Sequence, residues 1–442
     1  MASPNLDDLD VADLLEDLEA KSLITATRSS GATRYRLLDT MRAYALDRLD
    51  AGDAIEETRQ RHAIMRADLT DKRTSALNEP DQNYRAVLAA LLADEDDIDA
   101  AFAWALDHRP TIAGEIFAAL GPIIVTIGGL GFSFTKRFAE TVAAAEAGSP
   151  FTDLDKGLAA LVLVNTGEEQ RAEALVDALV ERPDLSVEAR AVALAIAAHN
   201  AIVLRDDTER GIALAEEAIH VANQVNERSV LTFLRWTVPI QHFQAGNIDR
   251  AIELVIENDT FPGLLRDAFP GHLLRYSAGV CWRPRDLERS TALLIQCLEE
   301  IAQVGDTKNG TFIEYHLALN KLAAGDDRGA AEDLAAVLPA MVDRGQTIAY
   351  GLMFEDLALA LARAGEPAAA VTAFAVADRQ LIARDETGYE VYVRRRERLL
   401  PELRESWGEE PFRAAWTDGH HLTLDEAVRH MQALVARSSH PT

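Results

Sequence analysis

The chain has 442 residues, too many for one compact core of the usual size, so its length favours either several domains or an extended repeat array. Hydrophobic residues make up 48% of the chain and only 15 residues are prolines, which excludes a disordered protein. The net charge of −28 argues against direct nucleic-acid binding, because so acidic a surface repels phosphate backbones.

The first fifty residues have a pattern of their own. A helix is expected over about 11–21, followed by the apolar run SLITAT, the polar turn SSGAT, the run RYRLL, and a helix over about 39–49. Two short extended runs around a Ser/Gly turn predict a β-hairpin. The order helix, hairpin, helix looks like the back half of a winged-helix domain with SSGAT as its wing. No basic segment followed by an apolar core precedes it, so we expect no export and a cytoplasmic protein.

The next hundred residues predict further helices. Residues 56–108 read as a helix, an acidic turn at 94–97 and a second helix. The apolar stretch 111–134 is long enough to span a membrane, but it contains Glu115, Pro122 and four glycines. We therefore favour a buried helical hairpin that turns at Gly128-Gly129 over a membrane helix.

From about residue 165 onward a polar or Gly-containing turn, a small residue and an apolar helix recur. The segments are GEEQRAEALVDAL, DTERGIALAEEAI, GNIDRAIELVIEN, RDLERSTALLIQC, GDDRGAAEDLAAV and GEPAAAVTAFAVA, with the small residue at Ala172, Gly211, Ala251, Ser290, Ala330 and Ala370. A regular period of about 40 residues is typical of one pair of antiparallel helices per repeat. The small residue is expected where the second helix of each pair crosses the first.

These patterns predict an all-α protein, a TPR-like α-solenoid with a small partial winged-helix segment at its N-terminus. We divide it into that segment (1–52), a helical linker with the first helical hairpins (53–150), repeats of about 40 residues (151–400) and a C-terminal helical cap (401–442).

Two segments carry a resemblance to a known family. KSLITATRSSGATRYRLLDTMRAYALDRLDAGD, continuing to Arg61-His62 and DIDAAFAWAL, is similar to the region that follows the nucleotide-binding part of bacterial STAND (NB-ARC) ATPase regulators of the LuxR, SARP or cyclase-linked type. LRESWGEEPFRAAWTDGHHLTLDEAVRHMQAL resembles the end of their helical-repeat sensor domain. The resemblance implies a winged-helix tail plus a tetratricopeptide-like sensor that acts with an ATPase and an effector domain.

The residues that would bind or sense a nucleotide are missing from this sequence. No GxxxxGK[ST] motif occurs, and GGLGFSFTKRF has the wrong glycine spacing. Where related ATPases have a Met-His-Asp motif on the winged helix, this chain has Leu37, Leu38 and Asp39. We therefore expect this chain to bind no cofactor. We expect the ATPase domain not to be part of this sequence.

A binding groove is the main candidate site. Aromatic residues at similar places in two successive repeats, together with the polar pair in ARAVALAIAAHNAIVL, could line a groove for a ligand or partner. The same residues could equally belong to the solenoid core. The proposed groove residues are Trp236, His242, Phe243, Tyr276, Trp282, His199 and Asn200.

No pattern indicates metal binding or catalysis. His420 and His421 are adjacent and lack the spacing of a zinc site, and Cys281 and Cys297 form no CxxC motif. No nucleophile motif such as GxSxG occurs. The basic run 394–396 reads as a solvated helix face that forms ion pairs, and the wing at 28–34 is not expected to contact DNA, because it follows an acidic helix.

The sequence therefore predicts a non-catalytic regulatory or sensor module in transcriptional or signalling control. It would bind a protein, a peptide or a small effector and act with a STAND-type ATPase. The alternative is an independent TPR-like scaffold for protein–protein interaction. If the half winged helix exposes the contact face of its missing half, it should favour a homodimer.

Overall fold

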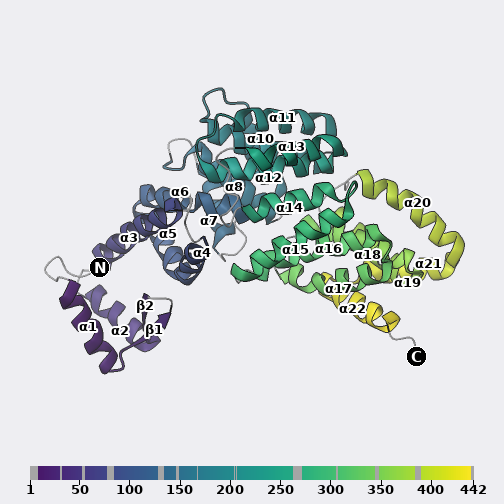
Figure 1. The fold of residues 1–442 in the computed structure, drawn as a ribbon. Helices are drawn as coiled ribbons and strands as arrows, with labels where there is room; N and C mark the ends of the chain where they lie inside the picture. Colours follow the sequence, from purple (N-terminus) through teal and green to yellow (C-terminus); the bar gives the residue numbers. More distant parts are fainter. Residues whose placement is uncertain are drawn as a thin grey trace. The chain divides into compact units, whose positions relative to one another are not determined.

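Helices joined by short turns make up most of the protein (Figure 1). The computed structural model describes residues 8–29, 32–51, 55–76, 84–127, 134–145, 149–166, 168–203, 205, 207–261, 271–304, 307–343, 348–383 and 390–439. Within these ranges the strands form one two-stranded sheet. The expected all-α solenoid with a small β-hairpin segment is confirmed. The chain folds as two compact units, of which the first holds residues 1–71 and 94–116 and the second residues 72–93 and 117–442.

The first unit begins with the helix, hairpin and helix that the sequence predicts. These elements are α1 (Asp8–Ala20), β1 (Ile24–Ser29), β2 (Ala32–Leu37) and α2 (Asp39–Ala51). The strands pair antiparallel, with Ile24 opposite Leu37. Ile24 is buried, whereas Tyr35 and Leu37, which lie on the same face of the sheet, are exposed. The hairpin is confirmed, and its assignment to a winged helix stays a prediction.

The acidic run 94–97 is an anchor, and the expectation of an acidic turn is wrong for most of it. Only Asp94 lies in the turn, because α5 (Glu95–His108) begins directly after it and takes the other acidic residues into its first turn, where the helix dipole favours them. The buried Asp94 carboxylate accepts hydrogen bonds from Arg34 of β2 at 2.6 Å and from Arg66 of α3 (Ile55–Ser75) at 2.7 Å. It thus ties the hairpin to a helix within the first unit.

The apolar stretch that begins near residue 111 forms α6 (Pro110–Ile127), and α7 (Thr135–Ala143) follows it. The expected turn at Gly128-Gly129 lies outside the described residues. No helix in the described part of the chain combines the length and the apolar character that a membrane crossing requires. α6 is buried over most of its surface, for example through Ile116, Phe117 and Ile124, and α4 (Tyr84–Ala93) buries Leu91.

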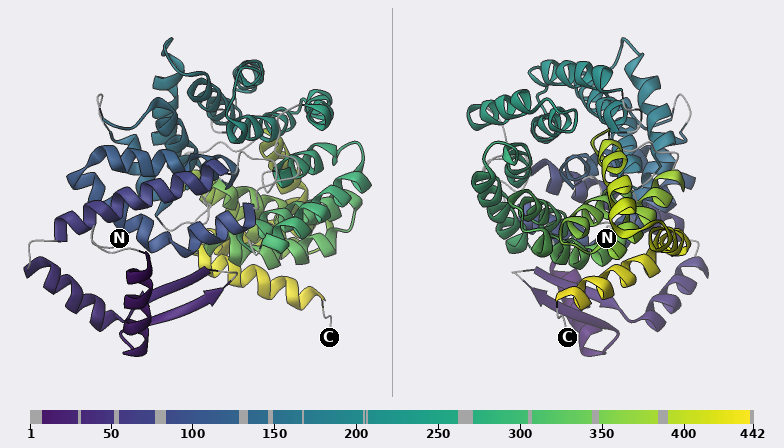
Figure 2. Two further views of the ribbon diagram at one scale, coloured as in Figure 1. Left: turned by 60° about the vertical axis from the view of Figure 1, so that its left-hand side comes forward. Right: turned by 90° about the vertical axis from the view of Figure 1, so that its right-hand side faces the viewer.

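Six helical hairpins follow in the second unit, and in Figure 2 (right) they trace an arc from teal to green. The helices pair in chain order as α8 (Asp153–Asn165) with α9 (Glu169–Val180), α10 (Val187–Val203) with α11 (Thr208–Ala222), α12 (Arg228–Gln244) with α13 (Ile248–Thr260), α14 (Gly271–Trp282) with α15 (Leu287–Val304), α16 (Thr307–Ala324) with α17 (Asp327–Asp343), and α18 (Ile348–Arg363) with α19 (Pro367–Ala383). This pairing confirms that each sequence repeat forms one helical hairpin.

The turn signature of the repeats is a helix stop followed by a helix start. Gly246 and Gly325 adopt positive φ angles of 77° and 83°, which end the first helix of their hairpins at little steric cost. The backbone N–H of the next residue closes the turn, as where Asn247 donates to the His242 carbonyl at 2.8 Å. In some hairpins an aspartate then caps the second helix, as where Asp326 accepts the Gly329 N–H at 3.0 Å.

The six small residues lie where the sequence predicts, buried between the helices of each pair. A Cβ atom added to Gly211 would come within 2.3 Å of the Ile202 side chain on the partner helix. Ser290 uses the close approach differently, because its hydroxyl donates to the Gly279 carbonyl at 2.6 Å. Short side chains therefore set the distance between the helix axes.

Three more helices follow the last hairpin, namely α20 (Glu390–Trp407), α21 (Glu409–His421) and α22 (Leu424–Ser439). Arg395 and Arg396 of α20 are largely buried and pair with Asp356 and Glu355 of α18, each at 2.8 Å. The expected ion pairs are present, but the description of this run as a solvated face is wrong for these two arginines. Burial raises the pKa of Glu355 to about 8 despite its arginine partner.

Candidate functional site

A cavity of about 250 Å³ lies in the second unit on the side formed by the first helices of the hairpins. Most of its wall comes from α8, α10, α12 and α14, and these successive first helices pack against one another. α6, α15 and α16 complete the wall. An occupant would therefore touch four consecutive hairpins at once. We call this cavity the pocket.

Aromatic side chains form one wall of the pocket. The Trp236 ring of α12 lies edge-on to Phe233 on its own helix, with centroids 5.9 Å apart, and to Tyr276 of α14 at 6.3 Å. Tyr276 in turn lies 5.6 Å from Phe312 of α16. These separations are typical of favourable ring pairs, so the wall is stiff as well as apolar.

Tyr276 is held in place from behind by a chain of hydrogen bonds. Arg283 donates to His316 Nδ1 at 2.9 Å, so the proton of this imidazole sits on Nε2 and is donated to the Tyr276 hydroxyl oxygen at 3.0 Å. Burial and the nearby Arg283 charge hold the pKa of His316 well below its usual value, which keeps the ring neutral. Asn320 accepts from Arg283 at 2.6 Å and donates to Ser290 at 2.9 Å, which connects the wall to the helix crossing of α14 and α15.

The described pocket wall contains no carboxylate, ammonium or guanidinium group. None of its nineteen described residues is Asp, Glu, Lys or Arg, although these types make up 26% of the chain. Burial lowers the pKa of His199, a wall residue on α10, to about 4, so this imidazole is neutral as well. A charged ligand would lose its hydration here without gaining an opposite charge.

Helix α12 presents three polar atoms of the wall that have no hydrogen-bond partner within the described structure. They are Trp236 Nε1, Thr237 Oγ1 and Gln241 Oε1. Gln241 is 1% exposed, and its Nε2 donates to the Ala195 carbonyl at 2.6 Å. Because that carbonyl is an acceptor, the amide orientation is settled and Oε1 is the atom without a partner. Buried polar atoms nearly always have a partner, and these three are available to one, as are some buried atoms outside the pocket such as Ser277 Oγ and Trp282 Nε1.

A proline shapes α12 between these polar residues. Pro239 has no N–H, so the carbonyl of Arg235, four residues earlier, loses its usual helical donor. Asn258 of α13 replaces that donor with its side-chain amide, at 2.6 Å from the carbonyl oxygen. The second helix of the hairpin thus completes the backbone of the first.

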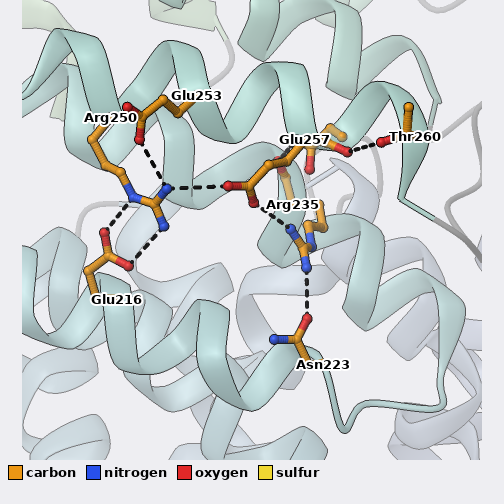
Figure 3. Close-up of polar contacts among 8 residues, drawn as sticks. Glu216, Asn223, Arg235, Arg250, Glu253, Glu257 and Thr260 are labelled. Carbon is orange, nitrogen blue, oxygen red and sulfur yellow. Dashed lines mark hydrogen bonds and ion pairs between the residues drawn. The ribbon is translucent and has the colours of Figure 1, made fainter.

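A cluster of polar residues, which we call the arginine network, connects α12 to α11 and α13 (Figure 3). It consists of Glu216, Asn223, Arg235, Arg250, Glu253 and Glu257. Arg250 binds Glu216 through Nε at 2.8 Å and Nη2 at 3.2 Å, and this bidentate contact joins two successive hairpins. It lowers the pKa of Glu216.

Arg235 is the buried member of the arginine network. Its guanidinium donates to Asn223 at 2.9 Å, lies 3.8 Å from Glu257 and stacks 3.5 Å from the Phe261 ring centroid. Burial lowers the pKa of Arg235 to about 10, which leaves the side chain charged at neutral pH. The chain thus gives this cation one hydrogen-bond acceptor, an acidic neighbour and an aromatic surface, while Nε and Nη1 have no hydrogen-bond partner within the described structure.

Three of the seven residues expected in a groove line the pocket, namely Trp236, Tyr276 and His199. They come from three consecutive first helices, which places the aromatic and the histidine candidates in one wall. Their role in binding stays a prediction.

The other four expected residues lie outside the pocket wall, and their role in binding also stays a prediction. His242 and Trp282 each follow a wall residue by six positions, which turns them about 240° round the helix to another side. His242 is fully buried and its Nε2 lies 3.4 Å from Glu216. Phe243 packs with Trp282 against Ala251 between α12, α13 and α14. Asn200 is the neighbour of His199 but is buried away from the cavity.

Sequence reasoning overlooked the polar residues of α12. Thr237 and Gln241 are four positions apart and therefore share a helix face, in a segment that is otherwise apolar over VPI. That spacing was visible in the sequence. The contribution of Phe312, which lies on a later hairpin, was not, because it depends on how the hairpins stack.

Comparison with known proteins gives partial matches. A stretch of 125 residues is 37% identical to HTH-type transcriptional regulators of Mycobacterium bovis and of two strains of Mycobacterium tuberculosis. The match covers 28% of this chain and 14% of each relative, so most of the length of those regulators has no counterpart in it. No family model matches the chain.

Among solved structures, the chain is similar to a STAND protein with a tetratricopeptide repeat sensor from Pyrococcus horikoshii. The TM-score is 0.43 with 11% sequence identity, over 98% of this chain and 61% of the other.

Proposed function

We propose that this protein is a non-catalytic regulatory module that recognises an effector or a partner segment at the pocket and acts in transcriptional or signalling control. The observation that carries the proposal is the composition of the pocket wall, which takes side chains from the first helices of four consecutive hairpins. The stretch that is 37% identical to HTH-type transcriptional regulators supports the regulatory setting.

The proposed mechanism is a shift in how the hairpins stack. A ligand that touches α8, α10, α12 and α14 favours the arrangement in which all four walls reach it at once. Because repeat proteins transmit contacts from neighbour to neighbour, this preference extends along the solenoid. The partner that reads the change would be a STAND-type ATPase, and the α1-to-α2 segment, as a winged-helix tail, would be its contact.

The non-catalytic part of the proposal is supported by the chemistry of the side chains. Burial raises the pKa of Cys281 and of Cys297 to about 12, so neither thiol forms a thiolate nucleophile at neutral pH. Apart from His272, the pocket wall consists of apolar, amide, hydroxyl and indole groups and the neutral imidazole of His199. Such groups recognise a ligand, while acid–base work at neutral pH needs a group whose pKa lies near 7.

A pull-down from the lysate of the source organism tests the proposal. The wild-type chain is compared with Trp236→Ala, which opens the pocket wall, and with Trp282→Ala, a matched loss of a tryptophan outside that wall. We expect an ATPase or a DNA-binding regulator to be captured by the wild type and Trp282→Ala and lost with Trp236→Ala. Capture of assembly or secretion components by all three forms would instead favour the independent scaffold.

A further inference from the structure

The pocket has the properties of a site for a small molecule. Its volume of about 250 Å³ falls just below the range of about 300–1,000 Å³ that is typical of ligand pockets, which limits an occupant to roughly one ring with its substituents. The wall is mainly aliphatic and aromatic, and it draws on several hairpins, so the occupant is surrounded on several sides.

The uncharged wall selects against ionised ligands. No side chain of opposite charge lies in the described wall for a carboxylate, a phosphate or an ammonium group to pair with. Moving such a group from water into this cavity costs its hydration free energy without compensation. An uncharged molecule avoids that cost.

The polar atoms of α12 then define which neutral groups fit. Gln241 Oε1 accepts a hydrogen bond, Trp236 Nε1 donates one, and Thr237 Oγ1 can do either. A ligand that satisfies them needs at least one donor and one acceptor beside an apolar body. A pure hydrocarbon would leave all three atoms without partners.

We infer that the pocket binds a compact, uncharged, largely apolar molecule that carries both a hydrogen-bond donor and an acceptor, of the kind represented by a primary aromatic amide. This inference rests on the proposed function and names the chemical class of its effector. Gln241 and Trp236 are the residues that would recognise the polar end.

Three probes of nearly equal shape test the charge selection. Benzamide is neutral, benzoate is an anion and benzamidinium is a cation, and all three carry one planar group on one ring. Binding to the full chain is measured by saturation-transfer NMR and titration calorimetry at pH 7.5. We expect benzamide to bind with a dissociation constant of about 1–10 mM, as its size allows, and both ions to bind at least about tenfold more weakly.

Variants of Gln241 locate the binding. Gln241→Leu should weaken the affinity for benzamide by about three- to tenfold, because the amide N–H of the ligand loses the Gln241 carbonyl as its acceptor. Gln241→Glu places a carboxylate in the wall and should reverse the preference in favour of benzamidinium. Gln296→Leu and Gln296→Glu, made at an exposed glutamine of α15, are the matched controls and should leave all three affinities unchanged.

The outcomes separate the inference from the proposed function. Equal binding of the three probes, absence of benzamide binding, or benzamide binding that Gln241→Leu leaves unchanged would each overturn the inference. If a regulator is still captured in a way that depends on Trp236, the proposed function survives and the pocket recognises a partner segment instead. If benzamide binds as expected while no regulator is captured, the inferred ligand class is supported and the proposal of a regulatory partner is contradicted.

Discussion

The two sides of helix α12 differ in the charge of their polar groups. On one side, Arg235 is buried in the arginine network among Asn223, Glu257 and the Phe261 ring, all supplied by the chain itself. On the other, Trp236 and Gln241 each leave a buried polar atom without a partner in the described structure. The first side joins α12 to its neighbours through a charged group, and the second carries uncharged residues of the pocket wall, where we propose binding.

The largest expected effect comes from emptying the arginine network. Arg235→Ala removes a cation whose side chain is 3% exposed and leaves Asn223 and the Phe261 face without it. We expect the free energy of unfolding to fall by about 2–4 kcal/mol, as measured by urea denaturation. Arg210→Ala, at an arginine of α11 that is 49% exposed, is the control and should change it by less than about 0.5 kcal/mol. Similar losses for the two variants would show that the network contributes no special stability.

The His199 imidazole in the pocket wall should make the free energy of unfolding depend on pH. Its pKa lies at about 4 in the folded protein against 6.5 for the free side chain, so between these values the unfolded chain binds a proton that the folded protein does not. Stability therefore falls as the pH drops through this window, by about 2 kcal/mol from pH 7 to pH 5.

The measurement compares urea denaturation of the wild type with that of His199→Gln at both pH values. Other titrating groups contribute equally to the two proteins, so the difference isolates His199. A wild type and a variant that lose the same stability over this range would show that the imidazole is not held in its neutral form.

A smaller effect concerns the backbone repair at Pro239. Asn258→Ala removes the amide that donates to the Arg235 carbonyl and should cost about 1–2 kcal/mol. Pro239→Ala restores an N–H at that carbonyl, so in this background the loss caused by Asn258→Ala should shrink by about 1 kcal/mol. A double-mutant cycle by thermal denaturation measures the coupling, and strictly additive effects would contradict the link between the two residues.

The smallest expected effect is that of Gln241→Leu on stability. The variant loses one hydrogen bond to Ala195 but also removes the carbonyl that has no partner, and the two changes oppose each other. We expect the free energy of unfolding to change by less than about 1 kcal/mol, in contrast to Arg235→Ala. A loss of several kcal/mol on chemical denaturation would assign this amide to the structural side of the comparison.

The repeat architecture was predictable because its signals are local. Each hairpin needs a small residue, such as Ala251 or Gly211, and a turn residue ahead of it, such as Gly246. This need arises within the hairpin itself, whatever the other hairpins do. The N-terminal hairpin was predictable for the same reason, because two short extended runs on either side of a Ser/Gly turn indicate that these two strands pair. The acidic run 94–97 was misread because its role depends on Arg34 and Arg66, which lie far away in the sequence.

The candidate site was only partly predictable. Trp236, Tyr276 and His199 were named because aromatic and polar residues stood out in apolar helices. His242 and Trp282 stood out equally, but they occupy another side of their helices, and composition does not state which side faces a neighbour.

The sequence by itself determined the helices, their pairing into hairpins and the absence of a P-loop motif, because propensity, turn chemistry and motif spacing act over a few residues. Only the tertiary structure decided that α8, α10, α12 and α14 meet around an uncharged cavity, and that Gln241 faces it while Arg235 is buried against α11 and α13. The physical reason is that a cavity forms where side chains of several helices fail to fill the space between them. That property belongs to the stacking of the repeats and to no single segment of the chain.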